Sequence, residues 1–173
     1  MAYQFLVRRS FHLGAALACA AGLSWAAEMA VPEKLDLSGL VNQHGQPFQA
    51  ADSMTTVMLV SGMKMKGMVR DALEELNVDC LREGRVVYLA NISGMPKLIS
   101  KMVAVPKLRN LDYPVWLDYS GDTATTLPAN KGEVTLLSIA SPGQVSVVSF
   151  VSSPEALLER LLPECGARAP AEN

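Results

Sequence analysis

The sequence predicts an α/β protein in which helices flank both faces of a mixed β-sheet. Two short continuous apolar runs, residues 56–61 and 85–90, are typical of strands that are buried on both faces. A segment with apolar residues at helical spacing follows each run, and this alternation predicts parallel strands. Two further runs, 134–140 and 145–151, flank the turn Ser141-Pro142-Gly143-Gln144 and predict an antiparallel hairpin.

The N-terminal half begins with a small β-hairpin around a turn at residues 42–46. After the strand at 56–61, a loop bounded by Gly62 and Gly67 leads into a helix over about 68–76. A second helix opens at Pro96, and Pro106 ends or bends it. The residues at helical spacing on this second helix are Leu98, Ile99, Met102 and Val103.

The C-terminal half adds a short strand at 114–118, the hairpin and a last helix. Ser153 is the expected N-cap of that helix and Pro154 its first residue. We expect one domain over residues 37–163, preceded by a linker at 27–36 and followed by a flexible polar tail at 164–173.

Residues 1–26 are predicted to be a cleavable signal peptide. Arg8-Arg9 precede an uncharged apolar stretch that is short for a membrane span, and small residues flank Trp25 at a signal peptidase site after Ala26. An uncleaved anchor is the alternative. A twin-arginine signal at residues 8–11 and a lipoprotein box ending at Cys19 are weaker variants of export. We therefore expect a periplasmic protein of the bacterial cell envelope with no membrane span after processing.

The composition excludes several classes of function. The chain has a net charge of -2, and its basic residues are scattered among acidic ones, which gives no nucleic-acid footprint. No Walker loop, Gly-rich dinucleotide motif or paired-Cys metal spacing is present. The sequence therefore predicts no cofactor, with copper as the one metal to consider.

Two segments resemble motifs of a known superfamily. Residues 39–48 resemble the N-terminal hairpin of thioredoxin-like proteins of the peroxiredoxin and thiol-disulfide oxidoreductase type. Tyr113-Pro114-Val115-Trp116-Leu117-Asp118 followed by Gly121 resembles their strand and turn. The resemblance covers about residues 37–162 and implies a thioredoxin-like fold. Residues 90–96 and 106–109 resemble a small periplasmic branch of this superfamily that lacks the Cys-x-x-Cys motif.

The departures from that pattern concern redox chemistry. Catalytic members carry a reactive Cys where the first core strand meets its helix, because the helix N-terminus lowers the thiol pKa. Here residues 62–67 contain no Cys, and the segment Gly132-Glu133-Val134-Thr135 has no counterpart of their cis-proline. The resemblance thus implies the fold without redox catalysis. An enzymatic function is therefore the less favoured hypothesis.

Cys80 and Cys165 remain after removal of the signal peptide. In a thioredoxin-like core the first and last helices pack on one face of the sheet and end at the same pole, so we expect these two residues to form a disulfide. Two unpaired thiols are the alternative. We place neither Cys at a helix N-terminus, and a thiol-disulfide or peroxide-reducing enzyme that uses Cys80 or Cys165 is a minor hypothesis.

Two further groups of residues are candidate sites. Met63, Met65 and Met68 form a thioether pattern that suits Cu(I), although methionines at such a place more often fill the core. Ser93, Gly94 and Met95 follow a strand at the edge where α/β sheets bind ligands, although this turn is also an ordinary start of a helix.

We therefore expect a binding or interaction module of the cell envelope whose partner is an envelope protein or a small ligand. A copper(I)-handling protein is the first alternative, and the thiol enzyme is the second.

The signal peptide generates the first testable prediction. Protein recovered from the envelope fraction of cells that express the chain is expected to begin at Ala27, which intact-mass measurement reports directly. A full-length mass, or a mass that includes a diacylglycerol on Cys19, contradicts the assignment.

Overall fold

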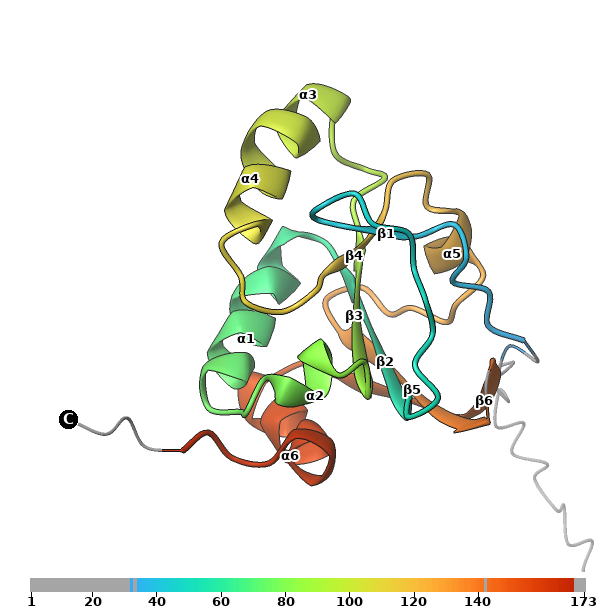
Figure 1. The fold of residues 1–173 in the computed structure, drawn as a ribbon, viewed down its shortest axis with the longest axis vertical. Coiled ribbons are helices and arrows are strands. Elements are labelled where there is room, and N and C mark those ends of the chain that lie inside the picture. The colour runs from blue at the N-terminus through green and yellow to red at the C-terminus, as the bar shows by residue number, and fades with distance from the viewer. Residues whose placement is uncertain (1–31, 33, 142, 170–173) are drawn as a thin grey trace, which may run out of the picture.

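A six-stranded mixed sheet forms the centre of the structure, a computed structural model that describes residues 32, 34–141 and 143–169 (Figure 1). The predicted signal peptide and most of the predicted linker lie outside the described residues. The strands are β1 (Val41–Asn42), β2 (Thr56–Ser61), β3 (Val86–Asn91), β4 (Trp116–Asp118), β5 (Val134–Ser141) and β6 (Gln144–Val151). The helices are α1 (Met63–Glu74), α2 (Asp79–Arg82), α3 (Lys97–Ile99), the π-helical turn η1 (Ser100–Ala104), α4 (Val105–Leu108), α5 (Asp122–Thr125) and α6 (Pro154–Cys165).

The strands lie in the order β1-β4-β3-β2-β5-β6. β2, β3 and β4 are parallel, whereas β1 pairs with β4, β5 with β2 and β6 with β5 in antiparallel fashion. At the centre, Met58 of β2 is paired with Tyr88 of β3 on one side and with Leu136 of β5 on the other. The mixed sheet predicted from the sequence is confirmed.

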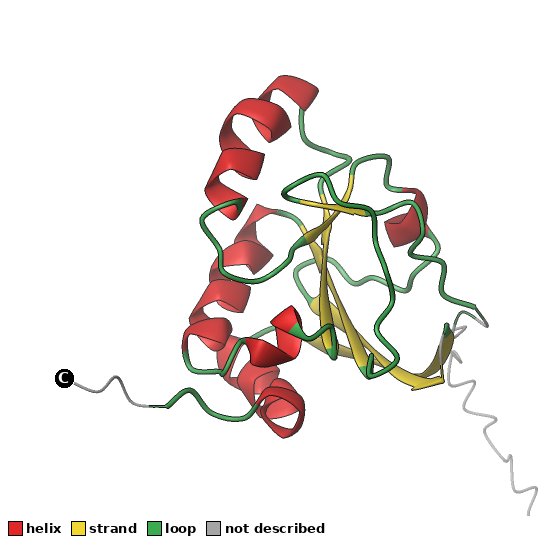
Figure 2. Cartoon of the chain, viewed as in Figure 1, coloured by secondary structure: helices red, strands yellow, loops and turns green. Residues whose placement is uncertain are grey.

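Alternate residues of the central strands enter two separate cores. Met58 and Val60 of β2 belong to a cluster with α1, α2 and α6, whereas Val57 and Leu59 belong to a cluster with α5 and residues 35–40. Figure 2 shows α1 and α6 on one side of the sheet and α5 on the other. Helices therefore flank both faces, as the continuous apolar runs of β2 and β3 require.

Helix α1 begins five residues earlier than the sequence pattern predicts. Gly62 adopts a left-handed φ of 87° at its N-cap, and the helix runs on from Met63 through Gly67. A glycine inside a helix costs only about 1 kcal/mol relative to alanine. Met65, Met68 and Val69 are all buried against the sheet, and this burial outweighs that cost.

The segment 97–108 is one continuous helical segment with a wide turn in its middle. Pro106 has no N–H, so the carbonyl of Met102, four residues earlier, receives no helical hydrogen bond from it. Just before it, the backbone N–H of Val105 donates to the carbonyl of Ser100, five residues back, which is the wider spacing of a π-helix. The helix therefore does not end at Pro106 but continues to Leu108. The expected apolar face is also placed differently, because Leu98, Ile99, Met102 and Val103 are exposed to solvent.

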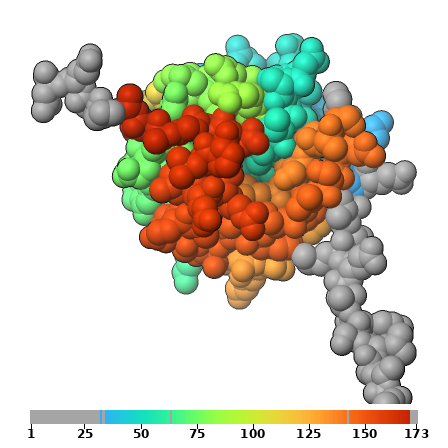
Figure 3. Space-filling model, turned by 90° about the horizontal axis from the view of Figure 1, so that it is seen from below, coloured from blue at the N-terminus to red at the C-terminus, as the bar shows by residue number. Residues whose placement is uncertain are grey.

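The C-terminal segment packs against the end of α1. Helix α6 continues past Pro163 to Cys165, two residues beyond the predicted end of the domain, and its N-cap Ser153 accepts the N–H of Ala156 at 3.2 Å as predicted. Ala167 then forms a β-bridge with Leu76. Figure 3 shows α6 and this segment, in red, beside the green residues that include α2. In the described part of the chain no helix is long and apolar enough to cross a membrane.

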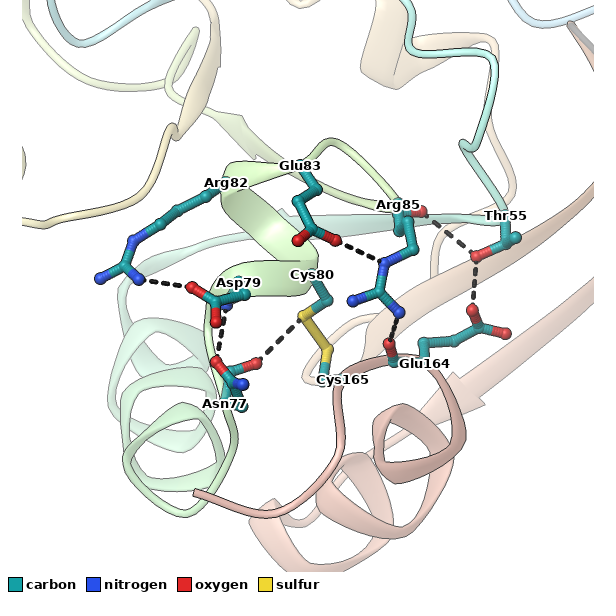
Figure 4. A network of polar contacts seen from close by, with 9 residues as sticks. All are labelled: Thr55, Asn77, Asp79, Cys80, Arg82, Glu83, Arg85, Glu164 and Cys165. Atoms are coloured by element: carbon teal, nitrogen blue, oxygen red, sulfur yellow. Dashed lines mark hydrogen bonds and ion pairs between the residues drawn. A yellow bond between two sulfur atoms is a disulfide. The ribbon is translucent and has the colours of Figure 1, made fainter. Parts of the chain in front are cut away.

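A disulfide joins Cys80 to Cys165, with Cα atoms 4.9 Å apart and a sequence separation of 85 residues. This prediction is confirmed, although Cys80 lies in the short helix α2, which the sequence pattern did not reveal. Polar contacts surround the bridge (Figure 4). The Arg85 guanidinium donates to the Glu164 carbonyl, and the Thr55 hydroxyl donates to the Glu164 carboxylate at 2.7 Å. The end of α6 is thereby held against the starts of β2 and β3.

Reduction of the disulfide is expected to lower the melting temperature. The chain-entropy model assigns a cross-link of this span about 4 kcal/mol as an upper figure. For a chain of this size that corresponds to about 10 °C. Thermal unfolding with and without dithiothreitol measures the effect. The double variant Cys80→Ala/Cys165→Ala is the control, since its melting should not respond to the reductant, and equal melting of oxidised and reduced wild type contradicts the prediction.

Candidate functional site

A pocket of about 610 Å³ opens where β2 and β3 end. Gly62 and Lys66 of α1 line one side, residues 91–96 between β3 and α3 line another, and Ile99 lies at the rim. Because β2 and β3 are parallel, their carboxyl ends meet at the same edge of the sheet, and the loops that follow them enclose the space between. Most of the exposed lining is contributed by apolar atoms.

The loop after β3 is held by its own hydrogen bonds. The Asn91 side-chain oxygen accepts from the backbone N–H of Ser93 at 3.1 Å and from its hydroxyl at 2.8 Å. The N–H of Met95 donates to the Ile92 carbonyl at 2.9 Å. Ser93, Gly94 and Met95, which the sequence marked as a ligand-binding turn, all line the pocket. The placement agrees with that hypothesis, and ligand binding by these residues stays a prediction.

The turn after β4 packs closely against this loop. A side-chain carbon at Gly121 would lie only 2.7 Å from the Ser93 hydroxyl oxygen, and Gly121 also has a left-handed φ of 84°. The buried carboxylate of Asp118 accepts from the backbone N–H groups of Gly121 at 2.7 Å and Ala124 at 2.8 Å. Asp118 is therefore engaged in holding the turn and the start of α5.

Lys66 gives the pocket its charge. The side chain is partly buried, and this desolvation lowers the pKa of its ammonium group below the usual lysine value. Within the described residues no carboxylate lies within ion-pair distance of Lys66. The first turn of α1 contains no acidic residue, and no side chain caps it. The helix start adds positive potential to that of the ammonium, so this end of the pocket suits an anion.

The methionines of the copper hypothesis lie in helix α1 and not in a surface loop. Met65 and Met68 lie in the first two turns of α1, and both are members of the core cluster. The side chain of Met63 lies outside the described ones. The described part of the chain holds no group of His, Cys, Asp and Glu that fits a metal ion. Burial favours the packing interpretation, and copper binding has no further support here.

The two cysteines lie at the opposite end of the sheet. Cys80 comes before β3, so the disulfide lies at the amino end of the parallel strands, whereas the pocket lies at their carboxyl end. Cys80 is fully buried and Cys165 is 6% exposed. A buried bridge offers an incoming thiolate little access to either sulfur.

Among the pocket residues that sequence reasoning missed are Lys66, Asn91 and Ile99. Asn91 carried a usable signal, because a polar residue that ends an apolar strand and precedes a Ser-Gly turn often holds that turn. The sequence pattern places Lys66 in a loop and Ile99 on the apolar face of a helix. Neither role follows from periodicity alone.

Among known proteins, only solved structures match this chain. No protein-family model and no curated protein matches the chain. A thioredoxin-like protein from Porphyromonas gingivalis matches with a TM-score of 0.50 and 14% identity over 78% of this chain and 93% of the other. A candidate protein disulfide isomerase from Bacteroides thetaiotaomicron matches with a TM-score of 0.51 and 14% identity over 78% and 89%.

At 14% identity, these two likenesses bear on the fold of the chain alone. The chain has the thioredoxin-like fold, and the resemblance found in its sequence is confirmed.

Proposed function

We propose that this protein is a binding module of the bacterial cell envelope that works without thiol redox chemistry. Its ligand is a small amphiphilic anion, held in the pocket at the carboxyl ends of β2 and β3. The observation that carries the proposal is the partly buried Lys66 ammonium at one side of a largely apolar cavity. A desolvated charge without a carboxylate partner is costly, and a bound anion would compensate it.

The dimensions of the pocket support a small-molecule ligand. Its volume of about 610 Å³ lies within the range of about 300–1,000 Å³ that such sites occupy. An acid group near Lys66 and the start of α1 would place an apolar body against Ile92, Met95 and Ile99. The loop of residues 91–96 is held in shape by the Asn91–Ser93 contacts, so its backbone is positioned before the ligand arrives.

Two features, one at each end of the parallel strands, support the absence of redox activity. At the carboxyl end, where the catalytic thiol of related enzymes sits, residues 62–67 contain no Cys. At the amino end, both cysteines form a buried disulfide. Export to the periplasm is supported by the N-terminal sequence and by this disulfide, because such bonds persist in oxidising compartments.

Replacement of Lys66 by methionine is expected to weaken the binding of decanoate, a simple apolar carboxylate, by about tenfold. The variant removes the charge-assisted contact to the acid group and keeps the apolar volume. Isothermal titration of wild type and Lys66→Met measures the effect. Lys64→Met is the matched control, because Lys64 is exposed on the same helix and does not line the pocket.

The pH dependence of decanoate binding separates this role of Lys66 from a general loss of structure. Only the protonated ammonium attracts the carboxylate, so affinity falls as the pH rises through the pKa of Lys66. That decline begins below the pH expected for an ordinary lysine, since burial lowers this pKa. Lys66→Met should show no such decline and should melt no lower than wild type. Equal decanoate affinity in wild type and Lys66→Met contradicts the proposal.

A further prediction is that the protein does not reduce insulin disulfides with dithiothreitol as electron donor. Insulin turbidity measures this reaction, with an active thioredoxin as positive control. Turnover that disappears in Cys80→Ser would contradict the prediction and would favour the thiol enzyme that uses Cys80 or Cys165.

A further inference from the structure

Four large apolar side chains on the segment α3-η1-α4 face solvent. Leu98 and Met102 are each 69% exposed, Ile99 is 48% exposed and Val103 is 47% exposed. Leu98 and Met102 are four residues apart, as are Ile99 and Val103, so each pair lies along one side of the helix. Together the two pairs form a continuous apolar strip, which we name the 98–103 face.

This face is distinct from the side by which the segment packs on the protein. Ser100 and Val105 are buried, and Leu108 packs against the main core cluster. The Ser100 hydroxyl donates to the Lys97 carbonyl at 2.9 Å, so this buried polar group is satisfied. In the described part of the chain the segment thus has one side toward the protein and a second, apolar side that is exposed to solvent.

The charges beside the 98–103 face are all of one sign. Lys97, Lys101, Lys107 and Arg109 are exposed, and the sequence contains no Asp or Glu between Glu83 and Asp112. The protein as a whole is slightly acidic, with 17 acidic and 15 basic residues. Among the described residues, every ion pair involves Arg70, Arg82 or Arg85, so the lysines of this segment are free to contact a partner's charge.

A second cavity, of about 280 Å³, lies on the flank of the same segment. Lys97, Lys101 and Ser100 line it together with Ser93 and Tyr119. The two ammonium groups and the phenol within this small cavity are donors that suit a phosphate group.

We propose that the 98–103 face docks on an anionic phospholipid bilayer. The helix lies in the plane of the interface, its four apolar side chains enter the boundary between headgroups and acyl chains, and the lysines contact lipid phosphates. A helix that combines an apolar strip with flanking lysines binds anionic surfaces in this way. Each lysine held near such a surface strengthens binding by about fivefold.

Charge also separates this occupant from a second copy of the chain. A symmetric dimer through the 98–103 face would bring the lysines of both copies together without an acidic residue between Glu83 and Asp112 to compensate them. An anionic bilayer supplies apolar contact and negative charge at once.

The test uses the full chain with vesicles of phosphatidylcholine that contain 40% phosphatidylglycerol, and with vesicles of phosphatidylcholine alone. We expect stronger flotation with the anionic vesicles than with the neutral ones, and this difference should shrink at high salt. Because the apolar stretch near the N-terminus can also bind lipid, amide hydrogen exchange locates the contact. Residues 93–111 should gain protection only with anionic vesicles.

Two pairs of variants assign the effect to side chains. Leu98→Ser/Met102→Ser and Lys97→Gln/Lys101→Gln should each weaken binding to the anionic vesicles by about tenfold or more. The matched controls are Val147→Ser, an exposed apolar residue of β6, and Lys131→Gln/Arg160→Gln, two exposed charges elsewhere. Both controls should bind as wild type does.

Unchanged flotation of the two double variants, or no added protection of residues 93–111, overturns the proposal. Binding of the wild type to an acidic protein but not to anionic vesicles overturns it as well. The outcome is independent of the proposed function, because Leu98 and Met102 do not line the 610 Å³ pocket and their replacement should leave decanoate binding unchanged.

Discussion

The burial of the parallel pair β2–β3 on both faces is the constraint on which the rest of the structure depends. Strands without a polar side need a cover on each face, and the chain supplies α1 and α6 for one and α5 with residues 35–40 for the other. A right-handed crossover through α1 then carries the chain back across the sheet. The same geometry brings the ends of β2 and β3 together, so that the pocket is a direct consequence of the parallel pairing.

At the carboxyl ends of β2 and β3 the fold retains a positive electrostatic field. The reactive thiol that catalytic thioredoxin-like proteins carry there is absent from residues 62–67. A helix that starts directly after a buried strand presents free N–H groups and a positive field, whichever residue stands there. In redox enzymes this field stabilises a thiolate. Here Lys66 adds its positive charge to this field, and we propose that both attract the anion that the pocket binds.

The two ends of the molecule have different tasks. The disulfide, the Arg85 and Thr55 contacts to Glu164, and the Leu76–Ala167 bridge tie α6 and the segment after it to the amino end of the strands. The pocket, the π-helical turn and the 98–103 face lie toward the carboxyl end. The cross-links are thus separate from the surfaces that we propose to bind partners.

The sequence by itself predicted the four long strands, because continuous apolar runs are local signals, and the resemblance supplied the fold and the expected partners of the disulfide. It also marked Ser93, Gly94 and Met95. Only the tertiary structure decided that α1 starts at Met63, that Lys66 enters the pocket, and that Leu98 and Met102 face solvent. The physical reason is that an apolar period shows that a helix has an apolar side, whereas what that side touches depends on segments distant in the sequence.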